Sequence, residues 1–246
     1  MDFYVETLFP EQVDSFLRAN ITGRAIDRGI INLECLNIRD FAVNSYGKVD
    51  DTMYGGGTGM LMQCGPVYDC WKSVADRRGG DAPYTVYVSP KGTVFNQAKA
   101  IELASRSSLL IICGHYEGID ARVIDEICDE EISLGDFVLT GGEIAAVTII
   151  DCISRMIPGV LPSSDAYMNE SHMSGTLEAR QYTKPAEWHG REVPAVLLSG
   201  NQAAIDEYNH INSLVETWQK RPDMLDNLQI SEEEWEKMLA MQKGLC

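Results

Sequence analysis

Glycine-rich loops that follow short apolar segments are the first candidates for chemistry in this sequence. The run 109–113 (LLIIC) leads into the loop 114–118 (GHYEG), and the extended segment 137–139 (FVL) leads into 140–143 (TGGE). Glycine allows backbone amides and carbonyls to approach a ligand closely, and open α/β sheets bind ligands at the carboxyl ends of their strands. The pattern predicts a small-molecule site here; the alternative is a set of ordinary turns between strands and helices.

A second glycine loop, 54–60 (YGGGTGM), carries four glycines between positions 55 and 59. No Gly-Lys-Ser/Thr follows it, so it is not a P-loop, and its spacing does not fit the dinucleotide-binding fingerprint. A flexible linker is the simple alternative. We favour a backbone surface for a flat ligand, because the apolar segment 60–62 follows directly.

An almost uninterrupted apolar segment, 144–157, contains the charged pair Asp151 and Arg155. A helix that is apolar on all sides is buried, either in the core or against a partner subunit. The two charged residues are four positions apart, which allows a local ion pair on one helix face. The functional alternative is an arginine held at the edge of a site.

These candidates need a scaffold, and the surrounding pattern predicts alternating strands and helices. Strands are expected at 1–10, 30–37, 84–88 and 109–113, extended pieces ending at 134–136 and 137–139, and helices at 10–19, from 22 onward, 66–74, 96–104 and 121–127. This alternation predicts an α/β fold, with a mostly parallel sheet and helices on both faces. After a polar lid or linker at 162–180, we expect a smaller domain with an amphipathic helix at 199–219 and a last helix begun by a Ser231–Glu234 capping box.

The composition limits the classes of function. The chain has 246 residues, a formal net charge of −17 and seven scattered cysteines without a CxxC pair. We therefore expect reduced, mostly buried thiols rather than a disulfide framework or structural zinc. We find no signal peptide and no membrane-spanning run, which predicts a cytoplasmic protein without membrane contact. The acidic charge counts against nucleic-acid binding, although local patches can still be basic.

The order of short motifs along the chain is its most specific feature. They are LFP 8–10, VDD 49–51, YGGG 54–57, GM 59–60, YVSP 87–90, GHYEGID 114–120, LGD 134–136, TGGE 140–143, RMIPGV 155–160 and LLSGN 197–201. As an ordered set spanning about residues 3–225, they resemble the bacterial tRNA (guanine-N1)-methyltransferase family, which modifies the guanine 3′ of the anticodon. A single glycine loop would have been weak evidence.

The resemblance implies a SPOUT-type fold with a C-terminal deep trefoil knot, which periodicity does not reveal. It implies a homodimer in which residues 1–161 form the knotted catalytic domain, 162–180 a lid and 181–246 a small, mainly helical domain. The cofactor is S-adenosylmethionine. The cofactor-binding residues carried over from the family are Tyr87, Val88, Ser89, Pro90, Gly114, Tyr116, Glu117, Gly118, Ser133, Leu134, Gly135, Phe137, Leu139, Thr140, Gly141 and Gly142.

The implied reaction is methyl transfer to N1 of a guanine in tRNA. That nitrogen is a poor nucleophile while protonated, so a carboxylate must remove its proton during attack on the methyl group. Arg155 matches the family's catalytic arginine, near the guanine O6 where negative charge develops. The implied substrate contacts are Gly59, Asp50, Glu117, Ser171 and Glu178. Members of the family are reported to need Mg²⁺, which makes this ion a further candidate cofactor, with no metal ligands assigned.

Two regions depart from the family pattern. The general base is an aspartate in the family, whereas the matching residue here is Glu170, followed by Ser171 and His172. The extra methylene moves the carboxylate by roughly 1 Å, and a misplacement of that size can cost about 10²-fold in rate. The helix after 197–201 is acidic where the family carries arginines that hold phosphates, and Lys220 and Arg221 are what remains.

Three functions therefore stay open. The leading one is a tRNA (guanine-N1)-methyltransferase that uses Glu170 and Arg155. The second is a diverged paralogue that methylates another acceptor, which the acidic smaller domain and the change to Glu170 favour. The third is a protein that binds the cofactor or RNA without turnover; the change to Glu170 motivates it, whereas Arg155 and the complete set of cofactor loops argue against it.

Overall fold

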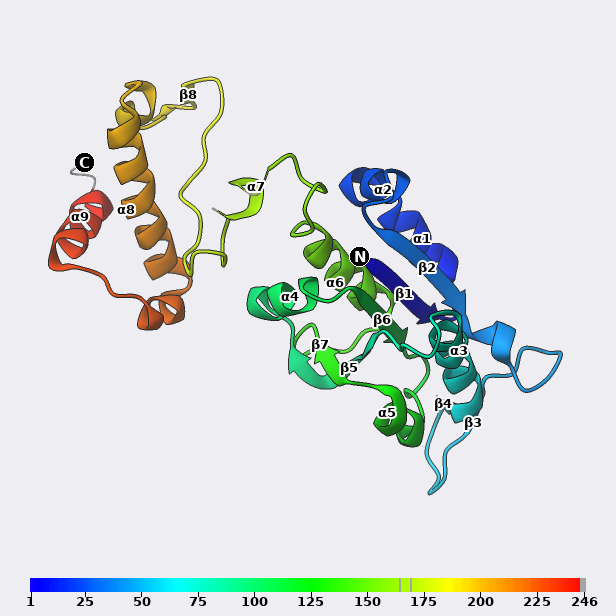
Figure 1. Ribbon diagram of the computed structural model, residues 1–246. Helices are drawn as coiled ribbons and strands as arrows, with labels where there is room; N and C mark the ends of the chain where they lie inside the picture. The colour runs from blue at the N-terminus through cyan, green and yellow to red at the C-terminus, as the bar shows by residue number, and fades with distance from the viewer. Residues whose placement is uncertain (164, 169, 244–246) are drawn as a thin grey trace. The chain divides into compact units, whose positions relative to one another are not determined.

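A parallel sheet of five strands is the framework of the larger part of the chain (Figure 1). The computed structural model describes residues 1–163, 165–168 and 170–243, and the chain divides into two units, Met1–Ser164 and Asp165–Cys246. In the sheet of the larger unit, every pairing is parallel. In spatial order, the strands are β2 (Asn32–Asn37), β1 (Asp2–Thr7), β6 (Ser108–Cys113), β5 (Tyr84–Val94) and β7 (Glu130–Ser133).

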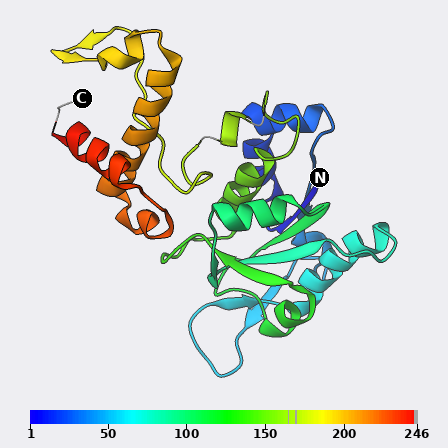
Figure 2. The same ribbon diagram turned by 60° about the vertical axis from the view of Figure 1, so that its left-hand side comes forward.

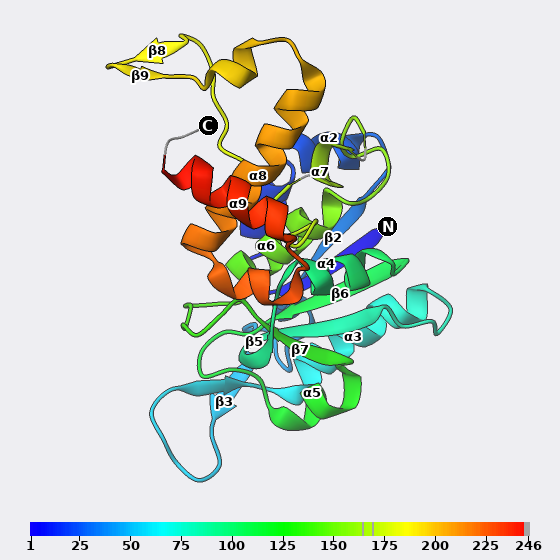
Figure 3. The same cartoon turned by 90° about the vertical axis from the view of Figure 1, so that its left-hand side faces the viewer.

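Helices cover both faces of this sheet (Figure 3). On one face lie α1 (Pro10–Leu17), α2 (Asn20–Asp27), α4 (Gln97–Ala104) and α6 (Glu143–Ser154). The other face carries the 3-10 turn η1 (Ile38–Phe41), α3 (Cys64–Arg77) and α5 (Ala121–Ile127). The α/β architecture expected from the sequence is confirmed, although α3 extends beyond the expected 66–74 at both ends.

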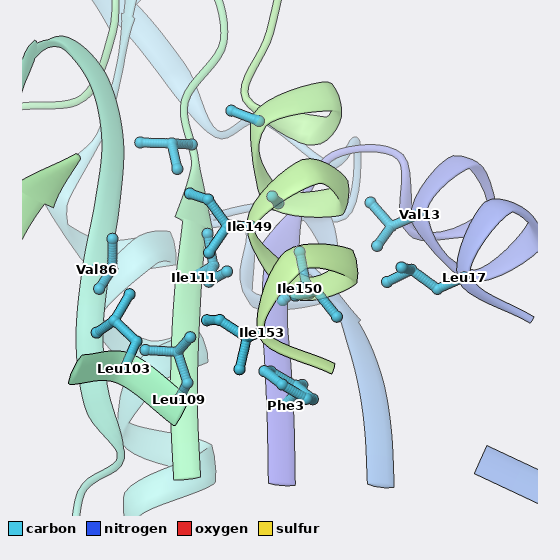
Figure 4. Packing of buried hydrophobic residues seen from close by; sticks show 14 of the residues in the cluster. Phe3, Val13, Leu17, Val86, Leu103, Leu109, Ile111, Ile149, Ile150 and Ile153 are labelled. Atoms are coloured by element: carbon cyan, nitrogen blue, oxygen red, sulfur yellow. The ribbon is translucent and has the colours of Figure 1, made fainter. Parts of the chain in front are cut away.

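The strand β6 belongs to both cores because its side chains alternate between the two faces. Leu109 and Ile111 join the cluster under α1 and α6, whereas Leu110 and Ile112 join the cluster under α3 and α5. A strand buried on both faces reads as a continuous apolar run, which is why 109–113 predicts it. Figure 4 shows the first cluster, where α6 contributes Ile149, Ile150 and Ile153.

A short antiparallel hairpin presents the glycine loop at one edge of the larger unit (Figure 2). Its strands are β3 (Asp50–Thr52) and β4 (Met60–Met62). Between them, Tyr54 is fully exposed, and the four glycines of the loop all have positive φ angles. The backbone of Met62 also bridges to Ile119, in the loop after β6. The glycine loop is therefore held by an ordered hairpin and does not link two domains.

The segment 137–139 is the clearest difference from the sequence expectation. It belongs to no strand, and Phe137 and Val138 are exposed. A short apolar run forms a strand only where it hydrogen-bonds to a neighbouring strand, and 137–139 pairs with none of the described strands. The segment 144–157 is largely buried in the core, as expected: α6 ends at Ser154, Ile149 and Ile153 are fully buried, and Ile144 is 61% exposed.

The smaller unit is built on two packed helices, α8 (Gln202–Lys220) and α9 (Glu232–Gln242). Their core includes Leu214 and Met238, and the Trp218 and Trp235 rings meet edge to face with centroids 5.5 Å apart. The predicted capping box at the start of α9 is present. The remaining elements are α7 (Asp165–Met168), the hairpin strands β8 (Glu187–Trp188) and β9 (Arg191–Glu192), and the 3-10 turns η2 (Ala195–Leu198) and η3 (Pro222–Asn227).

Within the described ranges, every cysteine is an unpaired thiol that is buried or half-buried, as expected, and Cys246 lies outside those ranges. None of the helices among the described residues is long and apolar enough to cross a bilayer.

Candidate cofactor and catalytic site

The carboxyl ends of β5, β6 and β7 surround a cavity of about 590 Å³. Its walls come from the segments 87–91, 114–121 and 131–142. All cofactor-binding candidates from the sequence line it except Gly135, namely Tyr87, Val88, Ser89, Pro90, Gly114, Tyr116, Glu117, Gly118, Ser133, Leu134, Phe137, Leu139, Thr140, Gly141 and Gly142. The carbonyl of Gly135 instead accepts a 3.0 Å hydrogen bond from the hydroxyl of Ser133, within the same wall.

The two principal loops of the cavity touch at glycines. The backbone N–H of Gly142 donates to the carbonyl of Gly114 at 3.1 Å. A Cβ atom on Gly142 would lie 2.7 Å from the Cα of Cys113, closer than real side chains approach a backbone. Glycine at this position therefore lets α6 begin directly against the end of β6.

The glycine hairpin is attached to the cavity loop 114–118 by backbone hydrogen bonds and by packing against Glu117. The N–H of Glu117 donates to the carbonyl of Met60, and the N–H of Met62 donates to the carbonyl of Gly118, both at 3.0 Å. A Cβ atom on Gly59 would lie 2.6 Å from Oε1 of Glu117, so the side chain of Glu117 packs directly on this glycine. The structure thus brings together two residues that the sequence proposed for seating the target base.

The cavity lining is rich in acidic groups. The carboxylates of Glu117, Asp125 and Glu131 line it, against the single lysine Lys91 among its lining residues. Burial, followed by the charge of Glu131, raises the pKa of Tyr87 to about 12, so its phenol is a neutral hydrogen-bond donor in the cavity. An acidic, partly apolar cavity favours a cationic ligand with an apolar body.

Comparisons with known proteins agree with this geometry. The family model described as tRNA (Guanine-1)-methyltransferase TrmD matches residues 1–227. The tRNA (guanine-N(1)-)-methyltransferase of Ruminiclostridium cellulolyticum is 47% identical over 228 residues, which cover 93% of this chain and 97% of that protein. The protein of the same name from Alkaliphilus metalliredigens is 46% identical over 246 residues, covering 99% and 100%. This chain belongs to the tRNA (guanine-1)-methyltransferase family. The resemblance deduced from the ordered motifs is confirmed.

Arg155 and Asp50, also carried over from the family, lie outside the cavity lining. Arg155 follows the last residue of α6, where its N–H donates to the carbonyl of Asp151 at 3.3 Å. The carboxylate of Asp151 accepts a 3.3 Å hydrogen bond from the hydroxyl of Thr22. Asp50 begins β3 opposite Met62. Both Arg155 and Asp50 belong to the larger unit; α6 begins next to the cavity loop at Glu143, and Arg155 follows its opposite end.

The lid candidates all belong to the smaller unit. Glu170 is half-buried, and its N–H donates to the carbonyl of Tyr167 at 3.2 Å. The hydroxyl of Ser171 accepts from the N–H of Glu178 at 3.0 Å and lies 3.4 Å from its carboxylate. His172 is exposed, with a φ angle of 73°. Ser171 and Glu178 are seven positions apart in sequence, and the structure brings them together in one turn.

The basic residues kept near α8 already have acidic partners in the smaller unit. Lys220 lies 2.5 Å from Glu216, which also binds Arg180, and Arg221 lies 2.7 Å from Asp223. Burial would raise the pKa of Glu216, but hydrogen bonds from Lys220 and Arg180 outweigh it and lower the pKa. These cations must therefore exchange partners before they can hold a phosphate group.

Sequence reasoning missed several residues that line the cavity. His115 lies inside the predicted loop 114–118, so its position alone could have nominated it. No local sequence pattern pointed to Asp125 on α5 or Glu131 on β7 as cavity residues. They reach the cavity only because their elements pack beside it. Lys91 lies in the irregular part of β5, between Val88 and Thr93, where the register to β7 shifts.

Proposed function

We propose that this protein is a tRNA (guanine-N1)-methyltransferase that transfers a methyl group from S-adenosylmethionine to N1 of the guanine 3′ of the anticodon. The observation that carries the proposal is the acidic cavity formed by the glycine loops, in a chain that matches the family model over residues 1–227. The relatives that match most of this chain carry the name of this activity.

The cavity volume of about 590 Å³ and its acidic lining support S-adenosylmethionine as the cofactor. When bound, this cofactor supplies a methyl group on a positively charged sulfonium. The backbones of 114–118 and 133–142 would hold the adenosine and the amino acid parts, with the Tyr87 phenol as a donor. Glu117, Asp125 and Glu131 would offset the positive charge. No group of three or more histidine, cysteine, aspartate or glutamate side chains in the described ranges could hold a metal, so we derive no step through Mg²⁺.

The chain's own residues supply the remaining steps of the proposed reaction. Glu170 accepts the N1 proton of guanine, which makes the nitrogen nucleophilic. Arg155 stabilises the negative charge that then develops on O6. The glycine hairpin and the side chain of Glu117, which pack against each other at Gly59, seat the flipped base. Asp50 and the Ser171–Glu178 turn complete the proposed substrate contacts.

The proposed assembly is a homodimer with a SPOUT-type trefoil knot. Residues 1–161 would form the catalytic domain, 162–180 the lid and 181–246 the small domain, in keeping with the division of the chain after Ser164. Large apolar side chains exposed on the larger unit support a partner subunit, because monomers rarely expose such groups together. They include Phe137, Val138, Leu139 and Ile144. A tRNA substrate would place the enzyme in the cytoplasm.

A second candidate is a diverged methyltransferase with a different acceptor. The pairing of Lys220 and Arg221 with their own carboxylates favours it, together with the net charge of −17. Each phosphate contact that is lost weakens RNA binding and reduces its dependence on salt. A third candidate, cofactor binding without turnover, is separated from the other two by any measurable methyl transfer.

The test is methyl transfer from labelled S-adenosylmethionine to a tRNA transcript with guanine 3′ of the anticodon, beside the same transcript with adenine there. We expect guanine-dependent turnover that falls by about 10²-fold or more in Glu170→Gln, because the base is removed. Glu170→Asp should keep turnover, and Glu236→Gln, an exposed change in α9, should leave it unchanged. Bound cofactor with no turnover on either transcript, even in Glu170→Asp, would move the assignment to a different acceptor.

A further inference from the structure

A chain of hydrogen bonds lies beneath the cofactor cavity and is not part of the proposed chemistry. Nε2 of His115 lies 2.7 and 2.8 Å from the two carboxylate oxygens of Glu143. The hydroxyl of Thr7 donates to Oε1 of the same carboxylate. Thr7 in turn accepts from the N–H of Phe9 at 2.9 Å. Thr7 and Glu143 are buried, and His115 lines the cavity.

These hydrogen bonds join three segments that are far apart in sequence. Thr7 ends β1, His115 belongs to the loop after β6, and Glu143 is the first residue of α6. The ring of Phe9 also packs edge-on against the imidazole of His115, with centroids 5.0 Å apart. The imidazole is therefore fixed both by a directional bond and by an aromatic contact, which leaves it one orientation.

The backbone of the TGGE loop lies directly on the His115–Glu143 pair. A Cβ atom on Gly141 would be 2.3 Å from Cε1 of His115 and 2.6 Å from Oε2 of Glu143. The neighbouring Gly142 bonds to the carbonyl of Gly114, which precedes His115. The pair thus sets the separation between the two loops that line the cavity on this side.

The pair also removes an electrostatic penalty. Glu143 is 6% exposed, and a carboxylate at such a site is costly unless hydrogen bonds satisfy it. His115 and Thr7 provide those bonds. Loss of the imidazole would leave a buried carboxylate under the Gly141 backbone with one hydroxyl as partner, and the loop would have to move to admit water.

We infer that His115 is a positioning residue for the cofactor site, held by Glu143 and Thr7, and that it acts by fixing the Thr140–Gly142 loop against the Gly114–Gly118 loop. The inference rests on the proposed use of S-adenosylmethionine. Because the displaced loop would no longer hold its backbone groups against the cofactor, we expect His115→Leu to raise the Kd for S-adenosylmethionine by roughly tenfold or more, which corresponds to about 1.4 kcal/mol of binding free energy. The value of kcat at saturating cofactor should change much less.

The decisive substitutions are those of Thr7, which lies outside the cavity lining. Thr7→Val, which keeps the shape and removes the hydroxyl, should also raise the Kd. Thr7→Ser and His115→Gln keep a donor to Glu143 and should restore most of the affinity. The control is His210→Leu, because His210 and Glu234 form an exposed pair with the same 2.7 Å separation in the smaller unit. It should leave the Kd unchanged.

The measurement is calorimetric titration of the full-length protein with S-adenosylmethionine and with S-adenosylhomocysteine, beside the Tm of each unliganded variant. A raised Kd in Thr7→Val and His115→Leu, with recovery in Thr7→Ser and His115→Gln, supports the inference. A lower Tm with a wild-type Kd would overturn it, because the network would then only stabilise the fold. Wild-type protein that binds no S-adenosylmethionine would overturn the proposed function as well, whereas binding without tRNA methylation would overturn only the acceptor.

Discussion

At the scale of single residues, the carboxyl group of Glu6 lies in an unfavourable environment, because it is fully buried. It lies on β1 between Leu36 and Ile112 of the flanking strands, is fully buried, and neither carboxylate oxygen has a hydrogen-bond partner among the described residues. Burial raises the pKa of Glu6 well above its usual range, and the neighbouring Cys70 lowers it only in part. The folded protein therefore keeps this carboxyl protonated at pH values where the unfolded chain releases the proton.

The pH dependence of stability follows from the direction of this pKa shift. Below its unfolded pKa of about 4.3, the Glu6 carboxyl is protonated in both the folded and the unfolded state. In that pH range its full contribution to the stability of the folded state is present. Its contribution is lost as the pH rises from there toward the raised folded pKa, because unfolding then releases a proton. We expect the free energy of unfolding, measured with urea between pH 5 and pH 8, to fall as the pH rises.

Replacement of Glu6 by an apolar residue should remove this dependence. Glu6→Leu should raise the free energy of unfolding at pH 8 by about 1–3 kcal/mol, because a buried group without a partner is removed. It should also flatten the pH profile relative to Glu236→Gln, which removes one exposed carboxylate. A profile of unchanged slope in Glu6→Leu would mean that other groups carry the pH dependence.

At the scale of elements, the cavity depends on α6 beginning against the end of β6. The contact requires glycine at 142, where a Cβ atom would also lie 2.6 Å from the Val88 side chain. Gly142→Ala should lower the free energy of unfolding by about 1–3 kcal/mol through overpacking. It should also weaken binding of S-adenosylmethionine, measured by calorimetry.

The matched control is the same change at a glycine with open surroundings. Gly65 lies in the first turn of α3 without a positive φ angle, and a Cβ atom added there would meet no neighbouring atom within 4 Å. Gly65→Ala should therefore raise stability slightly, by up to about 1 kcal/mol, since alanine suits a helix better. Equal effects of the two substitutions on cofactor affinity would show that the Gly142 contact does not shape the site.

At the scale of the whole molecule, the exposed apolar groups predict self-association. Val138 is 81% exposed and lies beside Phe137, which is 54% exposed. Val138→Asp should shift the protein from dimer to monomer in light scattering coupled to gel filtration, because an unpaired carboxylate buried at an interface is costly. Val43→Asp, at a side chain that is 63% exposed in another loop, should leave the mass unchanged. A dimeric Val138→Asp variant would place the interface elsewhere.

The sequence by itself determined the elements whose signals are local. The apolar run of β6 predicted a buried strand, Ser231 and Glu234 predicted the start of α9, and the glycines at 114, 118, 141 and 142 predicted loops at one end of the sheet. The ordered motifs also identified the family. Each of these signals is carried by residues close together in the chain, or by their order along it.

Tertiary structure alone decided the features that depend on partners. Residues 137–139 look like a strand but pair with none of the described strands, and Glu6 carries an acidic side chain but is fully buried beside Cys70 of α3. The pairing of His115 with Glu143, and of both with Thr7, joins positions up to 136 residues apart. Such contacts exist only when the packing of several elements brings distant groups together, and no local pattern of residues encodes that packing.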